Sequence, residues 1–232
     1  MEVGEFLTRL DDCMRRHDLL GHPFYQAWSR GALAREDILI YATDYYHHVE
    51  AFPRYLSCFL RRLPQGQLRQ AVLENLDDEL GSGLKPSHTA LWCDFAEGIA
   101  GGEANWTANP SRGVRNLVRF FQAKAKNDKP EQVLACFYAY ESQVPRIAQA
   151  KIKGLKEFYQ GDDRTCEYFT VHAVADVRHA HVWRQQLQQC VEMNPRAGID
   201  ALRAAETAAC VLWRALDGIE SARHMRATAL QR

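Results

Sequence analysis

Three side chains that can bind a metal ion recur at helical spacing in the segment HAVADVRHAH, residues 172–181. Offsets of four and seven residues place His172, Asp176 and His179 on one face of an α-helix. With the aromatic residues that extend it on each side, this face reads Phe169, His172, Asp176, His179, Trp183. Aromatic residues at both ends predict that the face points into the protein. His181 falls on another face, where we expect it to be exposed.

The chemistry that this face favours is metal binding. An isolated ionised aspartate costs several kcal/mol to bury unless it is paired or bound to a cation. Two imidazoles and a carboxylate that face one point are suitable ligands for a first-row metal. The alternative is a solvent-exposed face, which is the commoner arrangement for aspartate and histidine at this spacing.

Two further polar residues interrupt an apolar face in the preceding helix. That face reads Leu134, Phe137, Glu141, Val144, Ala148, Lys151, Leu155. Lysine is depleted from protein cores, and its pKa shifts readily on burial. Lys151 therefore either faces inward for a chemical reason or extends past the edge of the bundle. Lys153 and Lys156 lie off this face, where we expect them at the surface.

A glutamate and a histidine on two earlier helices also lie beside apolar faces. Glu79 ends the apolar face of one helix, and His88 begins the next helix. Three carboxylates and three imidazoles are thereby projected inward from four helices: Glu79, His88, Glu141, His172, Asp176 and His179. Two metal ions that share bridging carboxylates inside a helical bundle need this kind of set, with positions left open for dioxygen. A lone histidine on an apolar face, such as His48 or His17, is instead expected to be a hydrogen-bonded core residue.

Composition bounds the remaining function classes. The 232 residues contain 29 Lys and Arg against 29 Asp and Glu, so no net charge points to nucleic acid or an anionic membrane. The charged N-terminus lacks the apolar core of a signal peptide, and no apolar run approaches the ~20 residues that cross a bilayer. Seven scattered cysteines without a CxxC pair indicate reduced thiols, and we expect a cytoplasmic protein.

Helical periodicity covers nearly the whole chain, and no convincing strand pattern is present. We expect one all-α domain over residues 1–232, folded as a bundle of about seven helices. The expected helical segments are 4–20, a short one from 23, 34–62, 67–80, one from 88, 114–126, 130–159, 164–193 and one that ends near 225. Pro53 should kink its helix or mark a local break, and Pro145 should kink the helix that contains it.

The six candidate ligands, in this order, resemble the pattern of the haem-oxygenase-like di-metal oxidases. The resemblance covers essentially the full chain, from GHPFYQAW at residues 21–28 to the helix that contains HAVADVRHAH. Within that superfamily it is greatest to the CADD-like p-aminobenzoate synthases, whereas the related PqqC and TenA proteins share the fold but lack the full metal set. Glu79 and His88 lie nine residues apart, which is longer than the family pattern, and the additional residues fall in the loop GSGLKPS.

The resemblance implies an oxygen-dependent oxidase with two metal ions, either Fe/Fe or Mn/Fe, that takes electrons from an external reductant. It also implies that the protein supplies its own substrate, so that each chain reacts once and yields p-aminobenzoate for folate synthesis. Tyr25 matches the tyrosine that provides the aromatic ring, Lys151 matches the amino donor, and Tyr41 matches a second tyrosine implicated in radical or electron transfer. This fold commonly forms homodimers, which we also expect here.

Two alternatives stay open. The same metal scaffold could oxidise an external small molecule, such as a fatty acid or an amino acid. The chain could instead be a metal-free member of the superfamily: a PqqC-like cofactor oxidase, a thiaminase-like hydrolase or an interaction protein. Product formation without an added carbon substrate separates the first alternative from oxidation of the protein itself, and elemental analysis tests the second.

Overall fold

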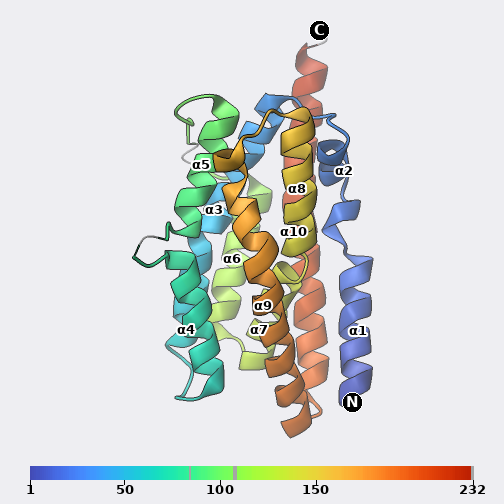
Figure 1. The fold of residues 1–232 in the computed structure, drawn as a ribbon. Coiled ribbons are helices and arrows are strands. Elements are labelled where there is room, and N and C mark those ends of the chain that lie inside the picture. Colours follow the sequence, from blue (N-terminus) through green and yellow to red (C-terminus); the bar gives the residue numbers. More distant parts are fainter. Residues whose placement is uncertain (84, 107–108, 231–232) are drawn as a thin grey trace.

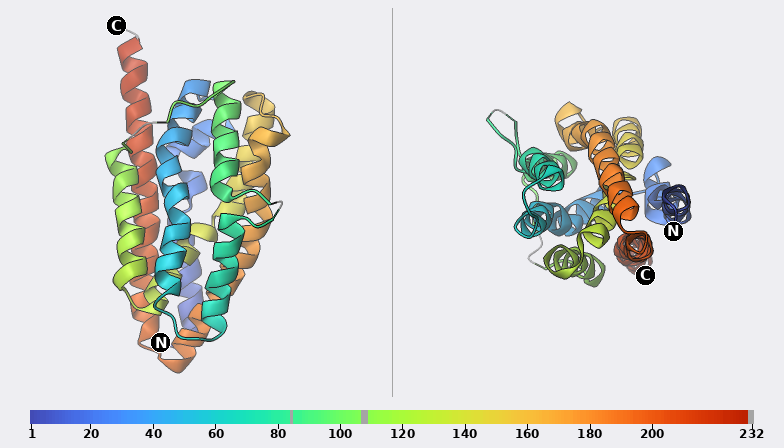
Figure 2. Two further views of the ribbon diagram at one scale, coloured as in Figure 1. Left: turned by 90° about the vertical axis from the view of Figure 1, so that its left-hand side faces the viewer. Right: turned by 90° about the horizontal axis from the view of Figure 1, so that it is seen from below.

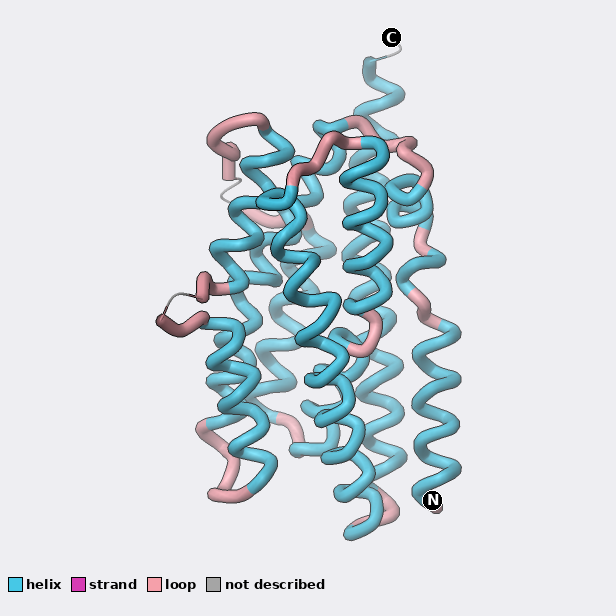
Figure 3. The backbone as a smooth tube through the Cα atoms, viewed as in Figure 1, coloured by secondary structure: helices cyan, strands magenta, loops and turns pink. Residues whose placement is uncertain are grey.

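A computed structural model of the protein describes residues 1–83, 85–106 and 109–230. Throughout these residues the structure consists of helices, turns and loops, without a strand (Figure 3). The helices are α1 (Val3–Arg16), η1 (Leu19–Gly21, a 3-10 turn), α2 (Pro23–Ser29), α3 (Arg35–Leu60), α4 (Gln67–Leu80), α5 (His88–Ala100), α6 (Arg112–Asn127), α7 (Pro130–Glu141), α8 (Val144–Phe158), α9 (Asp163–Met193) and α10 (Ala197–Leu230). The all-α class is confirmed, although the described residues form more helices than the bundle of about seven or the nine segments expected, because two of those segments are divided.

The longer helices run along a common axis, and the two termini lie at opposite ends of the bundle (Figure 1). α9 packs against α5, α7 and α8, while α4 packs against α3 and α5. α10 packs against α1, α6 and α7, and its C-terminal end extends beyond the other helices (Figure 2). Because α9 contacts helices from several parts of the chain, its inner face is the place where their side chains can meet.

Two of the expected helices are interrupted, and each interruption has a local cause. The first helix ends at Arg16 instead of near residue 20, because His17 leaves the helical conformation and Asp18 caps the following turn by accepting a hydrogen bond from the Leu20 amide. The segment 130–159 is not one kinked helix but α7 and α8. Pro145, in the first turn of α8, has no N–H to continue the α7 hydrogen-bond pattern. By contrast, α3 continues through Pro53 without a break.

The turn between α4 and α5 brings two candidate ligands together. α4 gives way to Gly81 with φ 71°, where a Cβ atom would lie 2.5 Å from the Lys85 carbonyl oxygen, so a close backbone approach requires glycine here. α5 then begins at His88, because the Ser87 hydroxyl accepts a hydrogen bond from the Ala90 amide at 3.2 Å. The expected loop GSGLKPS includes residue 84, which lies outside the described residues.

Aromatic side chains dominate the core around α9. Trp28, Trp92 and Trp183 are almost completely buried. Gly154 of α8 allows Trp28 to pack closely, because a Cβ atom there would lie 2.7 Å from the indole ring. No helix in the described part of the chain is both long and apolar enough to cross a membrane.

Candidate metal centre

The first cluster of candidate ligands joins three helices. Glu79 lies near the end of α4, His88 begins α5, and His172 lies in α9. One ligand atom from each residue lies within 4.8 Å of the others, and all three side chains are buried. Glu79 Oε1 is 3.1 Å from His88 Nδ1, and the ring centres of His88 and His172 are 4.3 Å apart. The nine-residue spacing between Glu79 and His88 therefore still lets the two side chains converge.

The second cluster includes two residues on the same inner face of α9, four and seven residues after His172. Glu141, the last residue of α7, meets Asp176 and His179, and their ligand atoms again lie within 4.8 Å of one another. His179 Nδ1 is 3.2 Å from Asp176 Oδ1 and 3.9 Å from Glu141 Oε1. Because α7 stops at Glu141, this carboxylate is held at the turn where the chain passes into α8.

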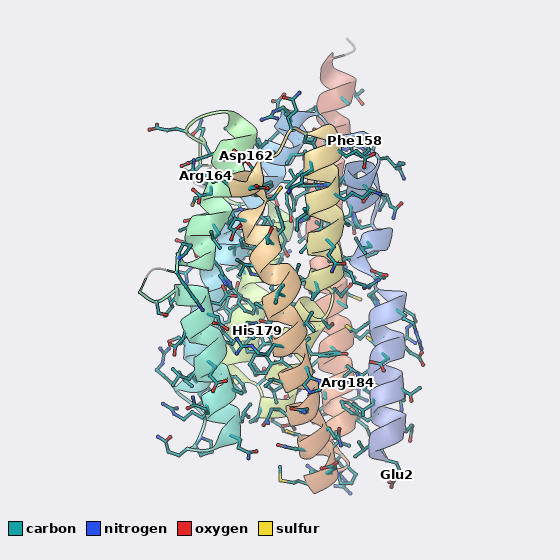
Figure 4. All side chains as sticks on the ribbon, viewed as in Figure 1. Glu2, Phe158, Asp162, Arg164, His179 and Arg184 are labelled. Carbon is teal, nitrogen blue, oxygen red and sulfur yellow. The ribbon has the colours of Figure 1, made fainter. Side chains whose placement is uncertain are left out.

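Both ring nitrogens of His179, and Nδ1 of His172, have hydrogen-bond partners in the structure. His172 Nδ1 lies 2.7 Å from the Tyr168 carbonyl oxygen, so Nδ1 is the donor and Nε2 keeps its lone pair. His179 has a carboxylate at each ring nitrogen, because Nε2 lies 3.0 Å from Asp78 Oδ2 and Nδ1 lies 3.2 Å from Asp176 Oδ1. Figure 4 shows His179 on the side of α9 that faces α4. Nδ1 of His179 faces Glu141 and Asp176, and it can bind a cation there when the ring proton is on Nε2 and is donated to Asp78.

Two residues that sequence reasoning did not connect with the site hold Glu141 in place. Asn75 Nδ2 donates to Glu141 Oε1 at 2.9 Å, and Trp183 Nε1 donates to Glu141 Oε2. Asn75 lies four residues before Glu79 on α4, so a polar residue one turn from a candidate ligand was the available signal. Trp183 was expected only to close the buried face of α9.

Burial disfavours the ionised form of the two carboxylic acids in the second cluster. It raises the pKa of Glu141 to about 8, against the partial compensation of His179. Burial and the nearby carboxylate of Glu79 raise the pKa of Asp176 well above its usual range. A divalent cation would offset this cost, and carboxylate oxygen with imidazole nitrogen suits iron or manganese. The residues present therefore fit a metal at each cluster.

A second group of predicted residues lies on the other side of the aromatic core. The hydroxyls of Tyr25 and Tyr41 are 3.2 Å apart, and the Lys151 amine donates a hydrogen bond to the Tyr41 hydroxyl. Lys151 Nζ also lies 4.6 Å from the ring centre of Tyr25 and 4.3 Å from that of Tyr41. Lys151 faces inward rather than toward solvent, since it is only 4% exposed, whereas Lys153 and Lys156 are exposed as expected.

The surroundings of Lys151 favour the uncharged amine. Burial lowers the pKa of Lys151 well below its usual range, and aromatic rings surround the amine at 4.3 to 5.9 Å. Burial also raises the pKa of Tyr25 and Tyr41, so both phenols keep their protons. A neutral amine next to neutral phenols is a nucleophile that needs no prior deprotonation.

Aromatic contacts connect this group to the first metal cluster. Tyr168 stacks on His172 with ring centres 4.0 Å apart and meets the edge of Trp92 at 4.7 Å. Trp92 in turn lies 5.8 Å from Tyr41. A cavity of about 30 Å³, roughly the volume of one water molecule, lies among these side chains and is lined in part by Tyr25, Tyr41, Tyr45, Tyr140, Lys151 and Tyr168.

The two other histidines on apolar faces behave differently from each other. His17 is half-buried and hydrogen-bonded as expected, with Nδ1 3.1 Å from the Cys13 carbonyl oxygen. His48 is fully buried, but neither ring nitrogen has a hydrogen-bond partner in the described part of the protein, so the expected hydrogen bond is wrong there. Burial lowers the pKa of His48 to about 3. His181 is exposed, as the helical phase predicted.

The helical fold and the paired clusters of acids and histidines together define a haem-oxygenase-like redox protein. Residues 39–213 match the model of a family described as iron-containing redox enzymes. The chain therefore belongs to that family and is an oxidoreductase. A solved structure from Shewanella denitrificans, described as having a haem-oxygenase-like fold, superimposes with a TM-score of 0.77 at 15% identity, over 98% of this chain and 95% of that one.

Relatives with a stated activity agree with the resemblance found in the sequence. The chain is 36% identical to the 4-aminobenzoate synthase of Chlamydia pneumoniae, over 91% of this chain and 93% of the relative. It is also 36% identical to the 4-aminobenzoate synthase of Nitrosomonas europaea, over 94% of this chain and 92% of the relative. The predicted resemblance to the CADD-like p-aminobenzoate synthases is confirmed.

Proposed function

We propose that this protein forms 4-aminobenzoate from its own side chains, in an oxygen-dependent reaction. Tyr25 supplies the ring and Lys151 supplies the amino nitrogen. The observation that carries this proposal is the burial of an uncharged Lys151 amine directly beside Tyr25, within an aromatic core that reaches the metal clusters. The activity of the relatives from Chlamydia pneumoniae and Nitrosomonas europaea supports the same product.

The six predicted ligands hold the metal pair in this proposal. Glu79, His88 and His172 form one position, and Glu141, Asp176 and His179 form the other. Two irons, or one manganese and one iron, would supply the activation of dioxygen when bound, with electrons from an external reductant. The chain's own contribution is to orient imidazole and carboxylate donors in advance and to shield them from bulk water.

The tyrosines and the lysine have separate roles. Tyr41 holds Tyr25 through the contact between their hydroxyls and accepts a hydrogen bond from Lys151, so it can pass a proton between phenol and amine. Trp92 and Tyr168 lie in contact between Tyr41 and His172, and we assign them the passage of electrons from the tyrosine pair toward the metal clusters. The burial of Tyr25, Tyr41 and Lys151 keeps bulk water away from the reacting side chains.

An external substrate is the alternative, and the size of the cavity argues against it. The space beside Lys151 measures about 30 Å³, which holds one water molecule but not an amino acid or a fatty acid. An external substrate would require the tyrosine-lined core to open. A source of ring and amine within the core needs no such opening.

We assign the activity to one domain over residues 1–232, placed in the cytoplasm, where its seven free cysteines stay reduced. We further propose a homodimer, which sedimentation of the purified protein tests directly.

The decisive experiment supplies purified metal-free protein with Fe²⁺ and Mn²⁺, a reductant and oxygen, but no carbon substrate. We expect at most one molecule of 4-aminobenzoate per chain. The mass of the intact protein should fall by the mass lost from Tyr25. An anaerobic sample is the control. Formation of product only after a carbon compound is added would overturn the self-oxidation proposal in favour of an external substrate. A protein that binds no metal under these conditions would overturn the metal proposal as well.

A further inference from the structure

The carboxylate of Asp78 joins the protein surface to the second metal cluster. Asp78 lies on α4, immediately before Glu79, and its side chain is 30% exposed. Its Oδ2 accepts a hydrogen bond from His179 Nε2 at 3.0 Å and a second from the exposed guanidinium of Arg178. One carboxylate oxygen therefore contacts both a buried candidate ligand and a surface cation.

The two α9 histidines differ in the charge of the group that orients them. His172 donates Nδ1–H to the carbonyl of Tyr168, a neutral acceptor one turn back on its own helix. His179 donates Nε2–H to a carboxylate that comes from another helix. A carboxylate acceptor draws the ring proton toward itself, so the opposite nitrogen becomes a stronger electron-pair donor than it would be with a carbonyl acceptor.

We propose that Asp78 is a positioning residue for the cluster Glu141, Asp176 and His179, and that it makes the two metal positions unequal. Carboxylates lie at both ring nitrogens of His179, Asp78 at Nε2 and Asp176 at Nδ1. When a cation binds Asp176, the ring proton is held on Nε2 by Asp78, which leaves the lone pair of Nδ1 toward Glu141 and Asp176. This inference rests on the proposed metal centre and adds to it a difference in cation affinity between the two positions.

Arg178 makes a charged acceptor tolerable at this depth. Its guanidinium contacts Asp78 from the solvent side, with a side chain that is 57% exposed. The Asp78 carboxylate is thus balanced on one side by a solvated cation and is bound on the other by an imidazole N–H. Arg178 Nη2 also lies 3.3 Å from His179 Nε2, so Asp78 of α4 meets both side chains at one point.

The test is a calorimetric titration of the metal-free, full-length protein with Co²⁺ alone, under anaerobic conditions. The variants are Asp78→Ala, which removes the acceptor, and Asp78→Asn, which keeps an acceptor oxygen but removes the charge. Asp77→Asn is the matched control, because Asp77 is the neighbouring acid and is exposed. Thermal unfolding of each metal-free variant checks that it is folded.

We expect the native protein and Asp77→Asn to bind two Co²⁺ per chain. In Asp78→Ala, the affinity of one of the two binding steps should fall about 10- to 100-fold while the other is unchanged, with a smaller fall in Asp78→Asn. If folded Asp78→Ala binds both ions as tightly as Asp77→Asn, the positioning role is wrong while the metal centre stands. Failure of the native protein to bind two ions would instead refute the metal centre.

A double substitution tests whether Asp78 acts through His179. His179→Ala should weaken, to a still measurable affinity, the same binding step that Asp78→Ala weakens. Adding Asp78→Ala to His179→Ala should then change the Co²⁺ affinity no further, because the group that Asp78 orients is gone. A further loss of affinity in the double variant would overturn the assignment of Asp78 to His179.

Discussion

The amine of Lys151 donates a hydrogen bond to the hydroxyl of Tyr41 inside an aromatic part of the core. Neither side chain has contact with bulk water, since Lys151 is 4% and Tyr41 is 1% exposed. The pair therefore combines a neutral base, the Lys151 amine, with a neutral acid, the Tyr41 phenol. Transfer of a proton from Tyr41 to Lys151 places two opposite charges side by side and leaves neither charge isolated.

Substitution of Lys151 tests its role as amino donor. Lys151→Met keeps a similar volume without nitrogen, and we expect a folded protein that makes no 4-aminobenzoate. Lys151→Arg should also make none, and burying a permanent charge there should lower stability by several kcal/mol. Lys153→Arg, at an exposed position two residues away, should retain full yield. The measurements are product per chain and the free energy of unfolding; normal yield from Lys151→Met would exclude Lys151 as the donor.

Substitution of the tyrosines separates the source of the ring from the route of electrons. Tyr25→Phe should abolish product and leave the intact mass unchanged after exposure to oxygen. Tyr41→Phe removes only the hydroxyl that joins Tyr25 and Lys151, so product should form more slowly. Tyr55→Phe is the control, because the Tyr55 hydroxyl is buried without a hydrogen-bond partner among the described residues. Loss of mass at another tyrosine in the native protein would show that Tyr25 is not the source.

Removal of one buried carboxylate should have opposite effects on the metal-free and metal-loaded protein. Burial and Glu79 raise the pKa of Asp176, so the metal-free fold pays a cost for this acid. Asp176→Asn should therefore unfold at the same or a higher temperature than the native protein without metal. Added Co²⁺ should stabilise the native protein more than the variant. Equal stabilisation of both proteins by Co²⁺ would show that Asp176 is not a ligand.

The unpartnered His48 should make the protein less stable in mild acid. Burial lowers its pKa to about 3 in the folded state, against about 6.5 in the unfolded chain. Between these values the unfolded chain binds the proton and the folded protein does not, so His48 contributes a loss of stability as pH falls from 6.5 toward 3. His48→Leu should remove this contribution and raise stability by about 1 to 3 kcal/mol. Unfolding curves at pH 5 and pH 7.5 give the free energy of unfolding of both proteins. If His48→Leu is no more stabilised over the native protein at pH 5 than at pH 7.5, the prediction is wrong.

The convergence of the candidate ligands could be predicted from the sequence because several of them repeat a helical period within apolar surroundings. His172, Asp176 and His179 share a phase that only one face of α9 can satisfy, and Lys151 breaks an otherwise apolar face in the same way. Such periodicity can be recognised in the sequence without knowledge of the tertiary contacts. The helical class and most helix positions follow from the same signal.

The residues that sequence reasoning missed are those defined by pairing across the bundle. Asp78 is half-exposed and off the apolar face of its helix, and its partner His179 lies 101 positions away. Tyr168 and Trp92 appear in the sequence as ordinary core aromatics, because only their packing against His172 and Tyr41 distinguishes them. The break between α7 and α8 was expected as a kink, because the sequence shows Pro145 but not how the adjoining turn is packed.

If Tyr25 supplies the ring as proposed, the tight packing around it determines how stable the chain is after its reaction. Tyr25 is 5% exposed and packs against Phe24, Tyr41 and Lys151. Loss of its ring would leave an unfilled void, and truncation of a buried aromatic residue typically costs about 3 to 5 kcal/mol. Domains of this kind have only about 5 to 15 kcal/mol of stability in total. A chain that has reacted would thus be a better substrate for proteases than one that has not, so its remaining amino acids would return to the cell after its single turnover.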